Sequence, residues 1–194
     1  MVKRVFVVHG WEGSPESDWF PWLKWELKKR KFIVEVPAMP DSDAPKIEAW
    51  INFLMKKVGK VDQETYFVGH SIGCQAILRY LEKLPGETQI GGCIFVAGWF
   101  SLQGLETQEE EEVAKPWLET KIDFAKIKRH TKNFVAIFSD NDPFVPYKEN
   151  SKIFKEKLGA KILLEQGKEH FDGAGCVTEL PVVLAEVLTM TKMK

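Results

Sequence analysis

The feature that most constrains the fold of this chain is a series of six short apolar runs rich in valine, isoleucine and phenylalanine. The runs lie at about residues 5–8, 32–36, 65–68, 93–97, 134–138 and 161–164. Runs of this length and composition are typical of strands that are buried on both faces of a sheet. The sequence therefore predicts a sheet of six buried strands.

Most intervals between these runs carry apolar residues at the spacing of one helix face. In the first interval this stripe runs from Trp19 to Leu27, and we expect Asp18 to cap the helix. Similar stripes at residues 47–58, 72–84, 153–158 and 180–188 predict further helices. Because parallel neighbours need a crossover long enough to hold a helix, the alternation predicts a three-layer α/β fold with a parallel sheet between helices.

The segment 99–129 breaks this rhythm. It has weak periodicity, a glycine at position 104, an acidic run at 109–112 and the pair Pro116-Trp117. Long connections without regular structure usually belong to lids or binding loops, so we expect an irregular lid or binding loop here. We also expect the acidic run to be a solvated face. The chain of 194 residues has the size of one domain, and we expect a single domain over residues 1–194.

The charge balance excludes several classes of partner. The chain has 27 basic and 28 acidic residues and a formal net charge of −1, so it has no overall field to hold a nucleic acid or an anionic membrane surface. No apolar run approaches the roughly 18 residues of a membrane span, and the N-terminus lacks the pattern of a signal peptide. We therefore expect a cytoplasmic protein that binds neither nucleic acid nor membrane.

The cysteine pattern bears on cofactors. Cys74, Cys93 and Cys176 form an odd set with neither a CxxC pair nor the spacing of metal ligands. Such a set favours free, buried thiols over disulfides or a zinc site. We expect neither a metal nor an organic cofactor.

A candidate nucleophile follows the third run, in Gly69-His70-Ser71-Ile72-Gly73. This is a GxSxG pattern between a strand and a helix, in which the glycines leave room for a serine on a sharp, strained turn. The turn presents the Ser71 hydroxyl above the sheet, and the helix that follows directs backbone N–H groups at charge that develops there. A serine hydroxyl at neutral pH also needs a base and a carboxylate that orients the base.

The candidate base is a histidine at another strand end. His170 follows the sixth run, in a loop before the last helix. His9 and His70 lie inside other motifs, and His130 lies in a basic stretch that is typical of a surface. We therefore favour His170 as the base.

The candidate acid follows the fifth run, in the stretch 139–146, where Asp140 and Asp142 are both placed to face the base. Two prolines after Asp142 fix the φ angles of its loop and deliver its carboxylate at the strand end. Asp140 is more suited to cap the turn with its own backbone. We therefore favour Asp142 over Asp140.

The order serine, aspartate, histidine along the chain resembles that of α/β-hydrolases, and almost the whole chain resembles the small α/β-hydrolases of the retinoblastoma-binding protein 9 type. The motifs that carry this resemblance are 69–73, 142–146, His170-Phe171 and Pro116-Trp117. The resemblance implies a minimal α/β-hydrolase fold with strand order 2-1-3-4-5-6. It also implies that Ser71, Asp142 and His170 form the catalytic triad.

Two departures from the family pattern bear on function. The family usually has glycine just before the catalytic histidine, where this chain has Glu169. The family's animal member is associated with retinoblastoma protein through a Leu-x-Cys-x-Glu segment. Residues 60–64 of this chain contain neither that leucine nor that cysteine, so a partner of the retinoblastoma type is not expected.

Two further sets of residues are expected at the site. In this fold one oxyanion donor is the backbone N–H of the residue after the nucleophile, here Ile72. The other comes from the loop after the first strand, where we favour the N–H of Trp11. The residues expected to line a pocket for a small hydrophobic acyl group are Trp99, Phe100, Leu102, Leu105 and Trp117.

The sequence thus predicts a serine hydrolase that cleaves a small hydrophobic acyl ester, thioester or amide through an acyl-enzyme, as a carboxylesterase or an aminopeptidase. The alternative is a protein-interaction module on a hydrolase scaffold with little or no turnover. Glu169 beside the base and the charged segment 106–129 favour that alternative. Thiol chemistry at Cys74 is a weaker hypothesis, because its place inside a helix predicts a buried, inert thiol.

Overall fold

A computed structural model describes residues 2–192 and has the predicted α/β architecture. The strands are β1 (Arg4–Val8), β2 (Ile33–Glu35), β3 (Thr65–His70), β4 (Gly92–Val96), β5 (Phe134–Ser139) and β6 (Lys161–Glu165). The helices are α1 (Phe20–Lys29), α2 (Ile47–Val58), α3 (Ile72–Lys83), α4 (Gln108–Glu119), α5 (Phe124–His130), α6 (Tyr147–Ile153), its π-helical continuation η1 (Phe154–Leu158), and α7 (Pro181–Met190). The six predicted strands and five predicted helical stretches are confirmed, with small shifts at their ends.

The six strands form one parallel sheet in the order β2-β1-β3-β4-β5-β6, as the family resemblance implied. Val8 at the end of β1 pairs with Gly69 of β3, and His70 at the end of β3 pairs with Val96 of β4. This register brings the carboxyl ends of the central strands to the same edge of the sheet. Ligands of open parallel sheets bind beyond that edge.

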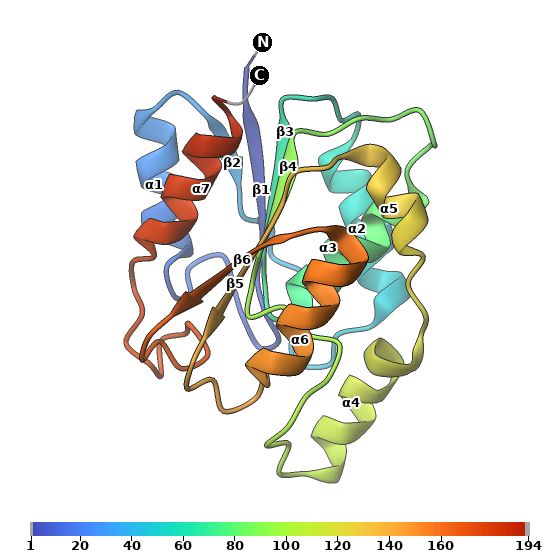
Figure 1. The fold of residues 1–194 in the computed structure, drawn as a ribbon, viewed down its shortest axis with the longest axis vertical. Helices are drawn as coiled ribbons and strands as arrows, with labels where there is room; N and C mark the ends of the chain where they lie inside the picture. The colour runs from blue at the N-terminus through green and yellow to red at the C-terminus, as the bar shows by residue number, and fades with distance from the viewer. Residues whose placement is uncertain (1, 193–194) are drawn as a thin grey trace.

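The helices form a layer on each face of the sheet (Figure 1). Helices α1 and α7 pack against each other on one face, and α2, α3, α5 and α6 cover the other. Every residue of β3, β4 and β5 is buried, which explains why these strands read as continuous apolar runs. Trp19 and Trp50 are fully buried beneath the helix layers.

The prediction of irregular structure over 99–129 is wrong in two places, because α4 and α5 lie there. A capping box begins α4, with Thr107 and Glu110 each bonding to the other's backbone N–H. Its remaining surface is mostly exposed, including most of the acidic run, and only Ala114 and Trp117 are buried. The helix therefore has too narrow an apolar stripe to show the usual periodicity.

Three smaller expectations are also wrong. Asp18 does not cap α1, because its carboxylate accepts a hydrogen bond from the backbone N–H of Gly173 at 2.8 Å. His130 is buried, with Nδ1 bonded to the Thr88 carbonyl, rather than on the surface. Cys176 is exposed, whereas Cys74 and Cys93 are buried, and all three are free thiols.

Within residues 2–192, the structure contains no helix that is both long and apolar enough to cross a lipid bilayer.

Candidate active site

The turn between β3 and α3 holds Ser71 in a strained conformation. Its φ of 51° and ψ of −123° lie in a region that residues with side chains rarely adopt. A Cβ at Gly69 would lie 2.8 Å from the backbone N of Cys74, and one at Gly73 would overlap the Val8 carbonyl oxygen. The flanking glycines are therefore required by close packing of strand, turn and helix, as a nucleophile elbow demands.

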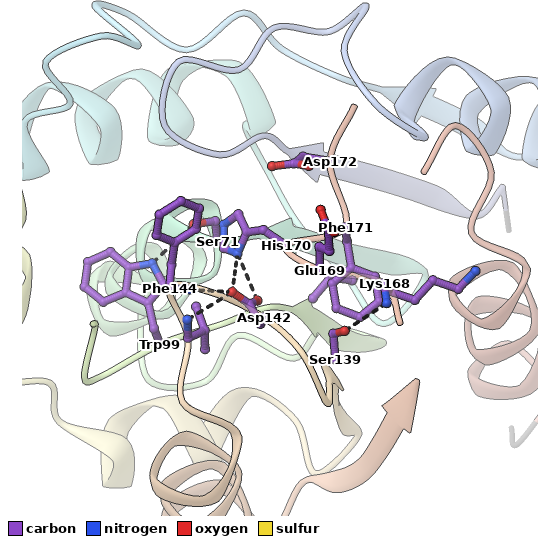
Figure 2. A network of polar contacts seen from close by, with 12 residues as sticks. Ser71, Trp99, Ser139, Asp142, Phe144, Lys168, Glu169, His170, Phe171 and Asp172 are labelled. Carbon is purple, nitrogen blue, oxygen red and sulfur yellow. Dashed lines mark hydrogen bonds and ion pairs between the residues drawn. The ribbon is translucent and has the colours of Figure 1, made fainter. Parts of the chain in front are cut away.

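The loops after β5 and β6 bring Asp142 and His170 together. Nδ1 of His170 lies 2.9 Å from Oδ2 and 3.1 Å from Oδ1 of Asp142 (Figure 2). Oδ1 also accepts hydrogen bonds from the backbone N–H groups of Phe144 and Val145, so the carboxylate is fixed in its loop. Because Asp142 is the acceptor, Nδ1 carries the hydrogen, and in the neutral imidazole Nε2 is left as the proton acceptor.

The hydroxyl of Ser71 lines the same cavity as His170. Its oxygen accepts a hydrogen bond of 3.3 Å from the indole Nε1 of Trp99 (Figure 2). Within the described residues no hydrogen bond joins Ser71 to the imidazole. Hydrogen bonds between nucleophile and base are often long without substrate and tighten when one binds.

The cavity above Ser71 has a volume of about 360 Å³. Its apolar wall includes Trp11, Ile72, Trp99, Leu102, Leu105 and Phe144. Its acidic side chains are Glu12, Asp18, Glu110 and Asp172, and among the described residues no lysine or arginine lines it. Burial raises the pKa of Asp18 above its usual value, and the Asp172 carboxylate raises it further.

The structure brings the two expected oxyanion donors to this cavity. Trp11 and Ile72 both line it, from the loop after β1 and from the first turn of α3. Within residues 2–192, no hydrogen bond occupies the backbone N–H of either residue. The Trp11 side chain is held separately, because its Nε1 donates to the Asp43 carbonyl.

Only part of the expected acyl pocket lies at the cavity. Trp99, Leu102 and Leu105 line it, but Phe100 and Trp117 do not. Phe100 packs against Phe124 and Phe154. Trp117 is buried against Trp50, and its Nε1 donates to the Pro45 carbonyl. These two aromatic residues therefore belong to the packing of the helix layer.

Sequence reasoning missed Phe144 as a wall of the cavity. Its ring meets the imidazole of His170 edge-on, with centroids 5.3 Å apart at an interplanar angle of 87°. The side chain is 37% exposed, so it stands at the mouth of the cavity. Its position two residues after Asp142, between two prolines, was the available signal.

Two other histidines, His70 in the cavity lining and His9 outside it, hold loops at the site. His70 is buried, and burial lowers its pKa to about 3, so the imidazole is neutral. Its Nε2 donates to the His170 carbonyl at 2.7 Å. Burial also lowers the pKa of His9, which accepts a hydrogen bond from Met39 and bonds to the Gly10 carbonyl through Nδ1. Both residues brace loops at the sheet edge.

Asp140 differs from expectation, and Glu169 lies beside His170 in sequence but outside the cavity lining. Asp140 does not cap its own turn, because its Oδ1 accepts from the backbone N–H of Gly167 at 2.8 Å. Glu169 is exposed and lies beside Gly175, outside the cavity lining. Its φ is 46°, which explains why a glycine suits this position.

Cys74 has the environment of an inert thiol. Its Sγ donates to the Val96 carbonyl, and burial raises its pKa well above the usual value. The thiolate that nucleophilic chemistry requires is therefore disfavoured. The described residues also contain no group of three or more histidine, cysteine, aspartate or glutamate side chains arranged to hold a metal ion.

Comparison with known proteins gives a family match over most of the chain. The family model for serine hydrolases matches residues 5–189. The chain is 34% identical over 190 residues to the putative hydrolase YdeN of Bacillus subtilis, which covers 97% of this chain and 96% of that protein. It is 27% identical over 179 residues to the serine hydrolase RBBP9 of Rattus norvegicus, covering 88% and 87% of the two chains.

Solved structures give the same result. The crystal structure of the ydeN gene product from B. subtilis superposes with a TM-score of 0.89 at 30% identity, covering 98% of this chain and 100% of that one. Est1E from Butyrivibrio proteoclasticus shares the fold, with a TM-score of 0.72 at 17% identity over 98% of this chain and 89% of its own. The family model that matches residues 5–189 and the 34% identity to YdeN over 97% of this chain show that this chain belongs to the serine hydrolase family.

Proposed function

We propose that Ser71, His170 and Asp142 form a catalytic triad that cleaves small hydrophobic acyl esters, thioesters or amides through an acyl-enzyme. The observation that carries this proposal is the contact of His170 Nδ1 with the buried carboxylate of Asp142 beside a cavity that also holds Ser71. This contact leaves Nε2 as the group that accepts the serine proton.

In the proposed reaction Ser71 Oγ attacks the acyl carbon while its proton passes to Nε2 of His170. Negative charge then develops on the carbonyl oxygen, and the N–H groups of Trp11 and Ile72 stabilise it, each contributing typically about 3 kcal/mol. The imidazolium next gives its proton to the leaving oxygen, sulfur or nitrogen. Water, deprotonated by the same imidazole, releases the acid and restores Ser71.

The lining of the cavity supports a particular substrate class. The apolar wall formed by Trp99, Leu102 and Leu105 suits a small hydrophobic or aromatic acyl group. The side chains of the lining that carry charge are carboxylates. His170 becomes positively charged only during the proposed reaction, when it takes the proton of Ser71. A substrate with its own carboxylate would be repelled, so we propose uncharged or cationic small molecules.

The site favours turnover over a purely binding role. The alternative of an interaction module drew on Glu169 and on the charged segment 106–129, and of these the Glu169 side chain lies outside the cavity lining. The cavity is also open above Ser71 and His170 rather than plugged by a side chain. We therefore propose an enzyme, with the carboxylesterase reaction as the first choice and the aminopeptidase reaction as the second.

The test is a Ser71→Ala variant assayed with a fluorophosphonate probe and an activated ester. We expect both labelling and hydrolysis to be abolished while the circular dichroism spectrum stays unchanged. Ser17→Ala is the matched control, because Ser17 lines the same cavity and its loss should leave labelling intact. Labelling that persists in Ser71→Ala would show that the nucleophile is another residue.

A panel of substrates then defines the bond and the acyl group. Esters, thioesters and aminoacyl amides with the same acyl group rank the leaving groups, and matched esters with an ammonium, a neutral or a carboxylate substituent test the acidic lining. We expect the carboxylate-bearing ester to be the slowest. A preference for that ester would contradict the proposed substrate class.

A further inference from the structure

The pairing of β5 with β6 continues beyond the end of the sheet through side chains. The last main-chain pair is Ser139 with Glu165, followed by a hydrogen bond from Asp140 N to the Glu165 carbonyl. From there, side chains of the last residue of β5 and of the loop after it accept from the main chain after β6. The contacts are Asp140 Oδ1 with Gly167 N (2.8 Å), Ser139 Oγ with Lys168 N (3.0 Å), and Asn141 Oδ1 with Glu169 N (2.9 Å). The contact of Asp142 with His170 is the next in this series.

Ser139 and Asn141 form a connected pair within this series. The Ser139 hydroxyl accepts from Lys168 N and donates to Asn141 Oδ1 at 2.8 Å (Figure 2 shows the first contact). That same amide oxygen accepts from Glu169 N. The two side chains therefore fix each other's orientation and bind two consecutive N–H groups immediately before His170.

The segment that carries His170 needs such support, because it is strained on both sides. Glu169 has a φ of 46° and Phe171 a φ of 57°, and neither is glycine. Conformations of this kind cost on the order of 1–2 kcal/mol each and persist only where the surroundings impose them. Without its contacts, this segment would relax and carry the imidazole away from Asp142.

The opposite side of the segment is held by different groups. His70 Nε2 donates to the His170 carbonyl, and Trp19 Nε1 donates to the Phe171 carbonyl at 3.0 Å. These donors bind carbonyl groups at and after the histidine. The N–H groups before it are bound by Ser139 and Asn141. One side of the segment thus meets hydrogen-bond donors, and the other side meets acceptors.

We propose that Ser139 and Asn141 are positioning residues that hold the imidazole of His170 in register with Asp142. The proposal rests on the proposed function, since it assigns the two residues to the base of that reaction. Neither residue lines the cavity, so we expect their effect on turnover to pass through His170.

The test compares three asparagine variants with Ser139→Ala. Asn141→Ala removes the acceptor, and because Asn141 is exposed the change leaves no cavity in the core. Asn141→Asp keeps an oxygen acceptor in the same place. Asn133→Ala is the matched control: Asn133 lies just before β5, at its other end, and its Nδ2 donates to the Gly91 carbonyl.

For an activated ester we expect Asn141→Ala to lower kcat by about ten- to a hundredfold, since a misplacement of about 1 Å costs up to about a hundredfold. KM should change little, because the acyl pocket is untouched. Asn141→Asp should restore most of kcat. Asn133→Ala should lower the melting temperature without lowering kcat. Ser139→Ala should reproduce the kcat defect of Asn141→Ala.

A second readout does not depend on turnover. The Nδ1–H of His170, bonded to a carboxylate, should give a far-downfield proton NMR signal that is present in wild type, Ser71→Ala and Asn141→Asp, and is weakened or lost in Asn141→Ala. Should Ser71 prove unreactive, the proposed function fails while this signal still decides the positioning role. An unchanged signal and kcat in folded Asn141→Ala, or an equal kcat loss in Asn133→Ala, would overturn the inference.

Discussion

The indole Nε1 of Trp99 donates a hydrogen bond to Oγ of Ser71 across 3.3 Å, from a ring that is 2% exposed. This contact occupies one lone pair of the hydroxyl oxygen, so the hydroxyl hydrogen must point elsewhere. In the proposed reaction this hydrogen passes to Nε2 of His170. Trp99, expected from sequence as a pocket wall, thus also orients the proposed nucleophile.

Replacing Trp99 with phenylalanine should slow the reaction of Ser71. The variant keeps an aromatic wall but lacks the N–H, and a hydrogen bond of this kind contributes about 0.5–1.5 kcal/mol. We expect the second-order rate of fluorophosphonate labelling to fall by about two- to tenfold. Trp117→Phe removes a buried indole donor remote from the cavity, and it should lower stability without slowing labelling. An equal loss of rate in both variants would contradict the role of Trp99.

The two aspartates after β5 should differ sharply in their effect on hydrolysis. Asp142→Asn removes the charge that orients and stabilises the protonated imidazole, and in other triads such a change lowers kcat by about 10⁴-fold. Asp140→Asn keeps the oxygen that accepts from Gly167 N, so its effect should be far smaller. Steady-state kinetics with one activated ester measures both. A larger defect in Asp140→Asn would exchange their roles.

Glu169→Gly should stabilise the protein. Glu169 has a φ of 46°, and relief of that strain exceeds the added entropy of the unfolded chain, for a net gain of about 0.5–1 kcal/mol. Urea unfolding measures the change in free energy of unfolding. Glu87, an exposed turn glutamate without a positive φ, is the control, and Glu87→Gly should give no gain. A gain in both variants would point to an effect of charge instead of backbone strain.

Stability should fall as the pH is lowered below about 6.5 because of His70. Burial lowers the pKa of its imidazole from 6.5 to about 3 in the folded protein. Between these values the unfolded chain binds a proton that the folded chain does not, so the free energy of unfolding decreases as pH falls, by up to about 1.4 kcal/mol per pH unit. His9, whose pKa burial also lowers, adds to this slope in the same direction.

The measurement for His70 is urea unfolding of wild type and His70→Gln at about pH 7.5 and about pH 5. Glutamine places an amide N–H where it reaches the His170 carbonyl but binds no proton. We expect a shallower pH dependence in the variant. Equal slopes in the two proteins would mean that His70 is protonated in the folded state.

The sheet and the serine turn could be predicted because the residue types that they require lie close together along the sequence. Strands buried on both faces must be continuously apolar, as β3 and β5 are. The glycines at 69 and 73 follow from close packing around Ser71. Helix α4 was missed because it buries few residues, although Thr107 and Glu110 carried the sequence signature of a capping box.

The contacts that hold the loop of His170, the proposed base, could not be predicted in the same way. Asn141 and Glu169 are 28 residues apart, and an exposed asparagine after a strand is ordinary loop composition. Which main-chain groups it binds depends on how two loops meet in space. The prediction that Phe100 and Trp117 line the pocket was wrong for a similar reason. Aromatic residues near a strand end suit a pocket and the packing of a helix layer equally well.

Because Gly73 has no side chain, the first turn of α3 packs directly against the Val8 carbonyl at the end of β1. This contact ties the serine turn to the first strand. The proposed nucleophile and the proposed oxyanion donors therefore lie on closely packed main chain. The loop that carries the His170 imidazole, in contrast, is held by the polar side chains of Ser139 and Asn141. A single substitution can remove either of these side chains. We therefore expect random substitutions to displace His170 more readily than Ser71, so that an inactive variant would commonly retain the serine in its turn.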